Sequence, residues 1–351
     1  MSEPDSKARA LARGTQRVVV IGDGGWGTAL ALMLHKNRIG VRVWSHDPAH
    51  AQILAREREN KRFLPGVPLP GAIEFSADPS EACHGADLAL SVVPTQFLRG
   101  VAERFEDALP GHMPIVSATK GLEIETFLTP TEILAQTIGE RPLCVLTGPT
   151  HAEEVARGKP ASLIAASKDE AFARRVQAAF GGDTLRVYTH GDPRGAELAG
   201  ALKNVIAIAA GICDGLELGD NAKAALISRG MVEMARFGRV QGAQAATFFG
   251  LAGMGDLMTT CYSRHSRNRA VGERVGRGES LQDILASMRM VAEGVWTTKA
   301  LFGPESDNSG VSMPIAQAVH SILFEGLTPR EAVLQLMQRE PAEEMQGLEL
   351  G

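Results

Sequence analysis

A glycine-rich turn near the start of the chain most narrows what this sequence can fold into. The segment Gly22-Asp23-Gly24-Gly25-Trp26-Gly27 follows the apolar run 17–21 and opens a helix-like stretch from Thr28 to Asn37. In a G-x-G-x-x-G turn between strand and helix, Gly22 permits the tight turn, Gly24 lets backbone approach a pyrophosphate, and Gly27 brings the helix against the strand. The pattern predicts the first βαβ unit of a dinucleotide-binding sheet.

The first half of the chain alternates short apolar runs with helical stretches. Asp47-Pro48 and Asp78-Pro79 predict helix starts, and Thr95 is expected to cap a third helix. Near-continuous apolar strands separated by helices predict a parallel sheet covered on both faces. We therefore expect an α/β Rossmann-type domain over residues 17–192, with strands near 17–21, 41–44, 87–93, 114–117, 143–146, 162–166 and 184–188.

Beyond Asp192-Pro193 the pattern is helical only. Apolar residues from Leu198 to Cys213 recur at helical spacing, which predicts a long linking helix that begins near Pro193. We expect an all-α C-terminal domain over 193–340, a disordered extension at 1–16 and a flexible tail at 341–351. Further helices of the C-terminal domain are predicted near 221–237, 243–250, 267–277, 280–288, 293–302, 313–324 and 329–338.

Composition excludes several classes of function. The net charge of −5 and the pI near 6.0 argue against a general nucleic-acid binder. The four cysteines form no Cys-x-x-Cys pair, and His46 and His50 have no third ligand nearby, so we expect no metal. No apolar run approaches the length of a membrane span, and no signal peptide is evident. These features predict a cytoplasmic protein without membrane insertion.

Two lysines and one basic run could carry chemistry. Lys120 lies just past a predicted strand, at the sheet edge where such folds bind ligands, although most lysines are simply solvated. Lys203 lies on the linking helix among small residues that leave room for a ligand, or for close helix packing. The run 263–269 suits a small phosphate group. It could equally be a solvated loop or an RNA contact, but it lacks interleaved aromatic residues.

Taken together, these motifs resemble the bacterial NAD(P)-dependent glycerol-3-phosphate dehydrogenase family. The resemblance implies reversible hydride transfer between sn-glycerol 3-phosphate and dihydroxyacetone phosphate, in a cytoplasmic homodimer that supplies phospholipid synthesis. The matching segments run in order along nearly the whole chain: 22–27, 63–65, 118–123, 148–154, 202–207, 253–257, 266–268 and 291–294.

The resemblance also assigns roles to residues. The catalytic lysine falls on Lys203, and the lysine that touches both substrate and cofactor falls on Lys120. Substrate positions fall on Lys120, Gly148, Thr150, Lys203, Asp256, Ser266, Arg267 and Asn268. Cofactor positions fall on Gly22, Gly24, Gly25, Trp26, Gly27, His46, Lys120, Ala152, Arg267, Val291 and Glu293.

One departure concerns Asp23, where the family commonly carries alanine. An acid in the phosphate turn must point away from the pyrophosphate. NAD enzymes usually place an acid at the end of the second strand, but Ser45 and His46 stand there and Asp47 is better used as a helix cap. With Arg42 and Arg56 expected nearby, the sequence favours NADP(H), with NAD(H) also usable.

The expected mechanism assigns the proton to Lys203, which would donate it in reduction and accept it in oxidation. Partial burial and Lys120 are expected to lower the pKa of Lys203. Arg267 and Asn268 would hold the substrate phosphate. Two alternatives remain: a dehydrogenase for a β-hydroxyacid or ketopantoate-like substrate, and a redox sensor that binds dinucleotide without turnover.

Overall fold

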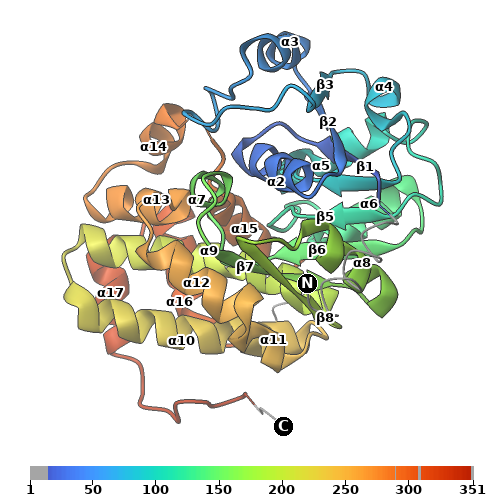
Figure 1. Ribbon diagram of the computed structural model, residues 1–351. Coiled ribbons are helices and arrows are strands. Elements are labelled where there is room, and N and C mark those ends of the chain that lie inside the picture. Colours follow the sequence, from blue (N-terminus) through green and yellow to red (C-terminus); the bar gives the residue numbers. More distant parts are fainter. Residues whose placement is uncertain (1–14, 289, 307–309, 349–351) are drawn as a thin grey trace. The chain divides into compact units, whose positions relative to one another are not determined.

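The computed structural model describes residues 15–288, 290–306 and 310–348, which form two compact units (Figure 1). The sheet unit runs up to Thr119 and from Pro130 to Pro193, and the helical unit comprises Lys120–Thr129 and the chain from Arg194 onward. The segment 120–129 belongs to the helical unit because Lys120 pairs with Asp256 and Phe127 packs edge-on against Phe237, with ring centroids 6.1 Å apart. The sequence placed this segment within a continuous domain over 17–192.

An eight-stranded sheet forms the centre of the sheet unit. Its strand order is β3-β2-β1-β4-β5-β6-β7-β8. The strands are β1 (Arg17–Ile21), β2 (Gly40–Trp44), β3 (Glu74–Ser76), β4 (Leu88–Ser91), β5 (Ile115–Ser117), β6 (Leu143–Thr147), β7 (Ala161–Ala166) and β8 (Leu185–His190).

This sheet confirms the predicted Rossmann-type architecture with two differences. The short strand β3 was not predicted, because three residues that include Glu74 and Ser76 give no apolar run. The expectation of a wholly parallel sheet was wrong at one pair, since β6 and β7 are antiparallel. The connection between them holds only the five-residue helix α7 (Ala152–Ala156), not the long crossover helix that a parallel neighbour usually needs.

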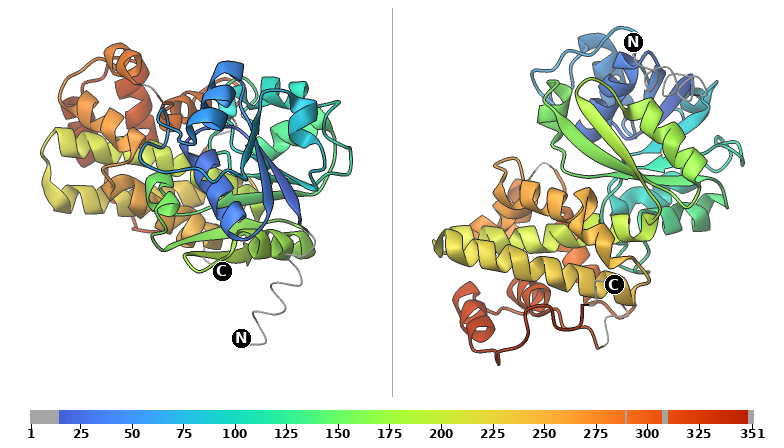
Figure 2. Two further views of the ribbon diagram at one scale, coloured as in Figure 1. Left: turned by 45° about the horizontal axis from the view of Figure 1, so that its top comes forward. Right: turned by 60° about the horizontal axis from the view of Figure 1, so that its bottom comes forward.

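Helices cover both faces of the sheet (Figure 2). Val18 and Val20 of β1 pack with α2 and α8, whereas Ile21 lies against α5 and α6, as alternating side chains on a strand require. Besides α7, the helices of this unit are α2 (Gly25–Lys36), α3 (Pro48–Glu57), α4 (Pro79–Cys83), α5 (Thr95–Arg104), α6 (Pro130–Ile138) and α8 (Glu170–Phe180).

Most of the predicted helix starts are correct. The carboxylate of Asp47 accepts the Ala49 N–H at 2.9 Å, and that of Asp78 accepts the Glu81 N–H at 2.7 Å. The expectation for Thr95 was wrong: Pro94 is the N-cap of α5, no side chain caps it, and Thr95 is the first helical residue.

The helical unit contains no strand among its described residues, as predicted. Its two longest helices, α9 (Pro193–Gly215) and α10 (Gly219–Val240), lie side by side with Gly230 facing Ile206 (Figures 1 and 2). The other helices are α11 (Ala245–Phe249), α12 (Asp256–Tyr262), α13 (Arg267–Gly276), α14 (Leu281–Ser287), α15 (Glu293–Leu301), α16 (Pro314–Phe324) and α17 (Pro329–Met337). Between α11 and α12 the chain forms the π-helical turn η1 (Leu251–Gly255), and α12 was not predicted.

The expectation that no apolar run approaches the length of a membrane span was wrong for helix α9. By length and composition it could cross a membrane, since its apolar window has a mean hydropathy of 1.5. Every residue of that window is buried inside the folded chain. The core helix of a soluble protein has the same composition, and the burial of α9 identifies it as the core helix of the helical unit.

Some described residues of the predicted extension and tail make specific contacts. Residues 1–14 of the predicted extension and 349–351 of the predicted tail lie outside the described residues. Thr15 is buried and accepts the Nε–H of Arg175 at 2.8 Å, and the Gln16 N–H donates to Asp87 at 2.7 Å. In the tail, Leu348 is buried and Arg236 of α10 donates to the Gln346 carbonyl at 2.6 Å. Contacts of this kind join residues far apart in the chain, so no sequence pattern predicts them.

The glycine turn brings α2 unusually close to β1. Gly22 has φ +119°, a conformation that side chains disfavour, and a Cβ on Gly27 would lie 2.2 Å from the Gly22 carbonyl oxygen. A Cβ on Gly24 would meet no atom within 4 Å. Gly22 and Gly27 therefore have the roles that the sequence predicted: Gly22 permits the tight turn, and Gly27 brings the helix against the strand.

We expect Gly27→Ala to lower the free energy of unfolding by about 1–3 kcal/mol, because the new methyl group meets backbone that cannot move aside. Alanine ordinarily favours a helix interior by about 1 kcal/mol over glycine, so a loss would report the clash. Gly24→Ala is the matched control and should leave stability without cofactor nearly unchanged. Chemical denaturation of the three proteins measures the difference, and equal stability of the two variants would contradict this packing.

Candidate functional site

The start of α2 is built to receive an anion. Gly24 is the N-cap of α2, no side chain caps its first N–H groups, and its first turn contains no acid. Uncapped N–H groups and the helix dipole favour a negative group such as a pyrophosphate. The open space beside Gly24 leaves room for it. The turn after β1 therefore fits a dinucleotide.

Asp23 points elsewhere, as predicted. Its Oδ2 accepts the hydroxyl of Ser45 at 2.6 Å and lies 2.6 Å from Nδ1 of His50. Both members of the Asp23–His50 pair are buried. The acid in the phosphate turn is thus held by the end of β2 and by α3.

Other predicted positions of the sheet unit also cluster. Ala152 opens α7, and a Cβ on Gly25 would lie 3.7 Å from the Ala152 Cβ. Trp26 packs against the hydrophobic core of the sheet unit. His46 is exposed just after β2.

Gly148 and Thr150 follow the carboxyl end of β6. Gly148 has φ +145°, and a Cβ there would lie 3.0 Å from the Ser162 carbonyl oxygen. The Thr150 hydroxyl donates to the Gly148 carbonyl at 3.2 Å. The turn is therefore fixed by backbone packing against β7, which orients Thr150.

The two arginines expected near the cofactor do not support that expectation. The Nε–H of Arg42 donates to Glu74 at 2.7 Å, and Arg56 pairs with its neighbour Glu57 at 3.2 Å. Arg42 lies on β2 with its side chain directed to β3 and α4, where it also donates to the Glu81 carbonyl. The remaining features that favour NADP(H) at this strand end are the exposed His46 and the use of Asp47 as a cap.

In the helical unit, two lysines meet on one buried carboxylate. Lys203 of α9 donates to Oδ1 of Asp256 at 2.8 Å, and Lys120 donates to Oδ2 at 2.5 Å. The side chains of Lys203 and Asp256 are 7% and 2% exposed, and that of Lys120 is 19% exposed. Lys120 is 83 positions from Lys203 and 136 positions from Asp256 in the sequence, yet the three residues share one site, as predicted for the two lysines.

The charges of this site depend on one another. Burial lowers the pKa of Lys203 to about 8; Asp256 opposes that shift and Lys120 adds to it. Burial alone would raise the pKa of Asp256, but the two ammonium groups outweigh it and hold this pKa below its ordinary value. The site therefore holds an ionised carboxylate beside a lysine that can release a proton near neutral pH.

Thr260 is a site residue that the sequence reasoning missed. Lys203 donates to its hydroxyl oxygen at 2.6 Å, and that hydroxyl donates to the Asp256 carbonyl at 2.6 Å. Asp256 and Thr260 are four residues apart on α12 and so share one helix face. That spacing could have revealed Thr260 if α12 had been predicted.

A close helix crossing places the predicted phosphate residues near Lys203. A Cβ on Gly211 of α9 would lie 2.0 Å from the Arg269 carbonyl oxygen, and one on Gly272 of α13 would lie 1.9 Å from the Ile208 carbonyl oxygen. The crossing lets the Asn268 side chain donate to Asn204 at 2.9 Å. Asn204 follows Lys203 directly, so this bond ties α13 to α9 beside Lys203.

The basic run ends in the helix start that was expected. Ser266 caps α13 by accepting the Arg269 N–H at 3.2 Å, and Arg267 is the first helical residue. The Arg267 side chain donates to the Val291 carbonyl at 2.8 Å, which brings two predicted cofactor positions together. Glu293, another of them, opens α15.

Two other members of the run have structural partners. Arg269 pairs with Asp214 at 2.7 Å. The Asn268 amide is buried, and its oxygen also accepts the Gly294 N–H at 2.9 Å. The role of Asn268 at a phosphate stays a prediction, because this amide already joins α9, α13 and α15.

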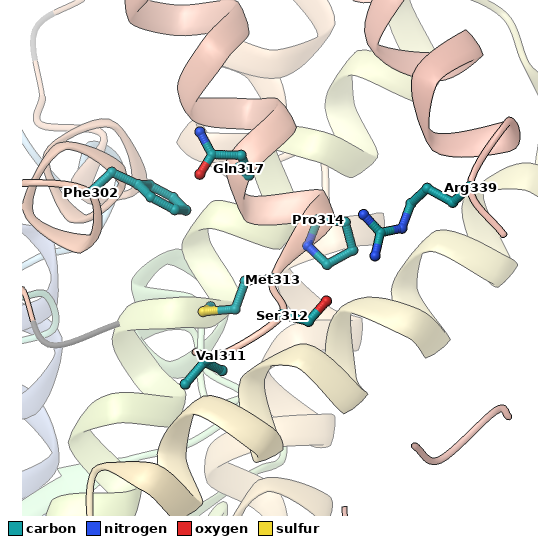
Figure 3. A pocket seen from close by; sticks show the side chains of 7 residues that line it. All are labelled: Phe302, Val311, Ser312, Met313, Pro314, Gln317 and Arg339. Carbon is teal, nitrogen blue, oxygen red and sulfur yellow. The ribbon is translucent and has the colours of Figure 1, made fainter. Parts of the chain in front are cut away.

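A separate hollow of about 300 Å³ lies at the start of α16, where Phe302, Gln317 and Arg339 surround Pro314 (Figure 3). None of the described residues that line it is a predicted site residue. The candidate site is therefore the carboxylate that binds Lys120 and Lys203, together with the start of α13.

Comparison with known proteins agrees with this geometry. Residues 17–173 match the family model of the NAD-dependent glycerol-3-phosphate dehydrogenase N-terminus, and residues 192–334 match that of its C-terminus. The chain belongs to this family.

Relatives share nearly their whole length with it. Glycerol-3-phosphate dehydrogenase [NAD(P)+] of Thermus thermophilus is 49% identical over 332 residues, covering 93% of this chain and 100% of the relative. The protein of that name from Chlorobium limicola is 46% identical over 331 residues, covering 93% and 99%. The crystal structure of glycerol-3-phosphate dehydrogenase from Coxiella burnetii superposes with a TM-score of 0.88 at 36% identity, covering 93% of this chain and 100% of that one.

We expect Thr260→Val to lower the pKa of Lys203 by about one unit, because a hydroxyl that accepts a bond from the ammonium group favours its charged form. Thr260→Ser keeps the hydroxyl and is the matched control. Titration of the Lys203 side chain by NMR in lysine-labelled protein, assigned with a Lys203→Arg variant, measures the shift. The same pKa in the Val and Ser variants would show that Thr260 does not stabilise the charge.

Proposed function

We propose that this protein interconverts sn-glycerol 3-phosphate and dihydroxyacetone phosphate, with NADP(H) or NAD(H) as hydride carrier. The observation that carries the proposal is the pair of lysines that share the buried carboxylate of Asp256. It is supported by relatives with nearly full coverage whose names specify glycerol-3-phosphate and NAD(P)+.

Lys203 is suited to move the proton of this reaction. Reducing a ketone places negative charge on its oxygen, and a cation aimed at that oxygen lowers the barrier. An ammonium group has three N–H donors; Asp256 and Thr260 take two from Lys203, which leaves the third for substrate. Lys203 therefore donates a proton to the alkoxide in reduction and, once neutral, accepts it in oxidation. When bound, the nicotinamide supplies or receives the hydride.

Lys120 and Asp256 support that transfer. The positive charge of Lys120 stabilises the same developing oxyanion and, with burial, keeps the pKa of Lys203 low. Asp256 fixes both ammonium groups in place. Without this carboxylate, two like charges would repel in a buried site.

The phosphate group is assigned to the start of α13. Ser266, Arg267 and the first N–H groups of this ten-residue helix offer hydroxyl, guanidinium and dipole to a dianion. The bond from Arg267 to the Val291 carbonyl pre-orients its guanidinium. Binding the remote phosphate would hold the reacting carbon in place, as efficient catalysis requires.

The wider role is also part of the proposal. We assign NADP(H) as the preferred carrier, with NAD(H) usable, and a homodimer in the cytoplasm that supplies glycerol phosphate for phospholipid synthesis. The partner is thus a small phosphorylated metabolite, not a nucleic acid. The acidic net charge agrees with that assignment.

A direct assay tests the function. Oxidation of NADPH and of NADH is followed by absorbance with dihydroxyacetone phosphate, with ketopantoate and with no second substrate. We expect oxidation with dihydroxyacetone phosphate only. Turnover of ketopantoate alone would favour the related hydroxyacid dehydrogenases, and cofactor binding without any turnover would favour a sensor.

Lys203→Ala should reduce turnover by about 10²–10⁴-fold with the fold intact, because the proton donor is lost. Lys223→Ala is the matched control, since Lys223 is also buried and pairs with Asp214 at 2.8 Å. Wild-type reduction should slow above pH 8 as Lys203 loses its proton, whereas oxidation should quicken over the same range. Near-normal turnover of the Lys203 variant would remove Lys203 from the mechanism.

Arg267→Ala should raise KM for dihydroxyacetone phosphate by about tenfold or more, since a charge-assisted bond to phosphate is lost. Arg264→Ala removes the same charge from the same loop and should leave KM nearly unchanged. Steady-state kinetics give both values. An equal rise in the two variants would point to general attraction of the anion by the basic run.

A further inference from the structure

The glycine turn contains an acid that the proposed mechanism does not use. Asp23 is buried, and its Oδ2 binds the Ser45 hydroxyl and His50 Nδ1, each at 2.6 Å. Its carbonyl accepts the side-chain N–H of Asn60 at 2.7 Å. Ser45 and His50 therefore hold the carboxylate, and Asn60 holds the backbone of the same residue.

That position is the carboxyl end of β2. Ser45 directly follows Trp44, the last residue of β2, and is itself fully buried. In Rossmann folds an acid at this strand end binds the ribose hydroxyls of NAD, and its charge opposes the 2′-phosphate of NADP. The sequence has no such acid available there, because Asp47 caps α3. The fold instead brings the Asp23 carboxylate, from the turn after β1, to Ser45 at this strand end.

The described cations around this strand end have partners of their own. Next to Asn60, Lys61 pairs with Glu57 at 3.1 Å and Arg62 lies over the Phe63 ring. His50 from α3 is the direct partner of Asp23, and His46 is exposed after β2. Arg42 is paired with Glu74 and Arg56 with Glu57. Ser45 gives its hydroxyl to Asp23 and is not free to donate to a phosphate.

We propose that Asp23 is a specificity-determining residue whose carboxylate limits the preference for NADP(H) and keeps NAD(H) usable. The inference rests on the proposed function only in taking a nicotinamide dinucleotide as the ligand. Removing the charge of Asp23 should strengthen binding of the cofactor that carries the 2′-phosphate and leave binding of the other nearly unchanged. Asp23 acts by charge and by holding Ser45, not by chemistry at the nicotinamide.

The test compares direct binding of NADPH and NADH to the full-length protein by cofactor fluorescence, without substrate. Asp23→Asn keeps the shape and an acceptor for Ser45 but removes the charge. We expect the ratio of Kd for NADH to Kd for NADPH to rise about tenfold. Asp87→Asn is the matched control: it removes one carboxylate at the amino end of β1, where Asp87 binds the Arg17 N–H at 3.0 Å, and should not change the ratio.

An unchanged ratio, or an equal loss of affinity for both cofactors, would reduce Asp23 to a structural tie and overturn the inference. If the Asn variant does not fold, Asp23→Ala gives the same comparison. A wild-type protein that binds both cofactors but does not reduce dihydroxyacetone phosphate would refute the proposed function alone, since the binding ratio is measured without turnover.

Discussion

The site depends on one carboxylate that holds two ammonium groups. A buried lysine without a counter-ion would lose its proton or destabilise the fold, and two such lysines would also repel each other. Asp256 gives one oxygen to Lys203 and the other to Lys120, so Lys203 can stay buried with Lys120 aligned beside it. Because burial still lowers the pKa of Lys203, the same arrangement that stabilises the charge leaves the proton transferable.

The surrounding helices follow from that requirement. The turn η1 delivers Asp256 at the start of α12, and one helical turn later Thr260 completes the shell around Lys203. The glycine contacts between α9 and α13 let Asn204 and Asn268 bond across the crossing. As a result, Lys203 on α9 and the phosphate residues at the start of α13 are held on two helices that are bonded to each other, and placement on rigid elements favours precision.

The sheet unit solves a different problem, which is to receive a large anion. Gly22 and Gly27 bring the uncapped start of α2 against the end of β1, and Gly24 leaves space beside it. Asp23 is compatible with this anion site only because Ser45 and His50 hold its carboxylate aside. An acid that looks unfavourable in the motif is thereby moved to the strand end where cofactors are distinguished.

The sequence by itself determined the Rossmann-type sheet, the helical second half, the glycine turn and the two lysines, because periodicity and turn chemistry are local properties. It could not place segment 120–129 with the helical unit, predict α12 or find Thr260, since these depend on contacts between residues far apart in the chain. The tertiary structure also decided which charged groups lie at the end of β2. Arg42 is paired with Glu74, whereas Asp23 binds Ser45, which directly follows β2. Charge acts through space, and only the folded chain sets those distances.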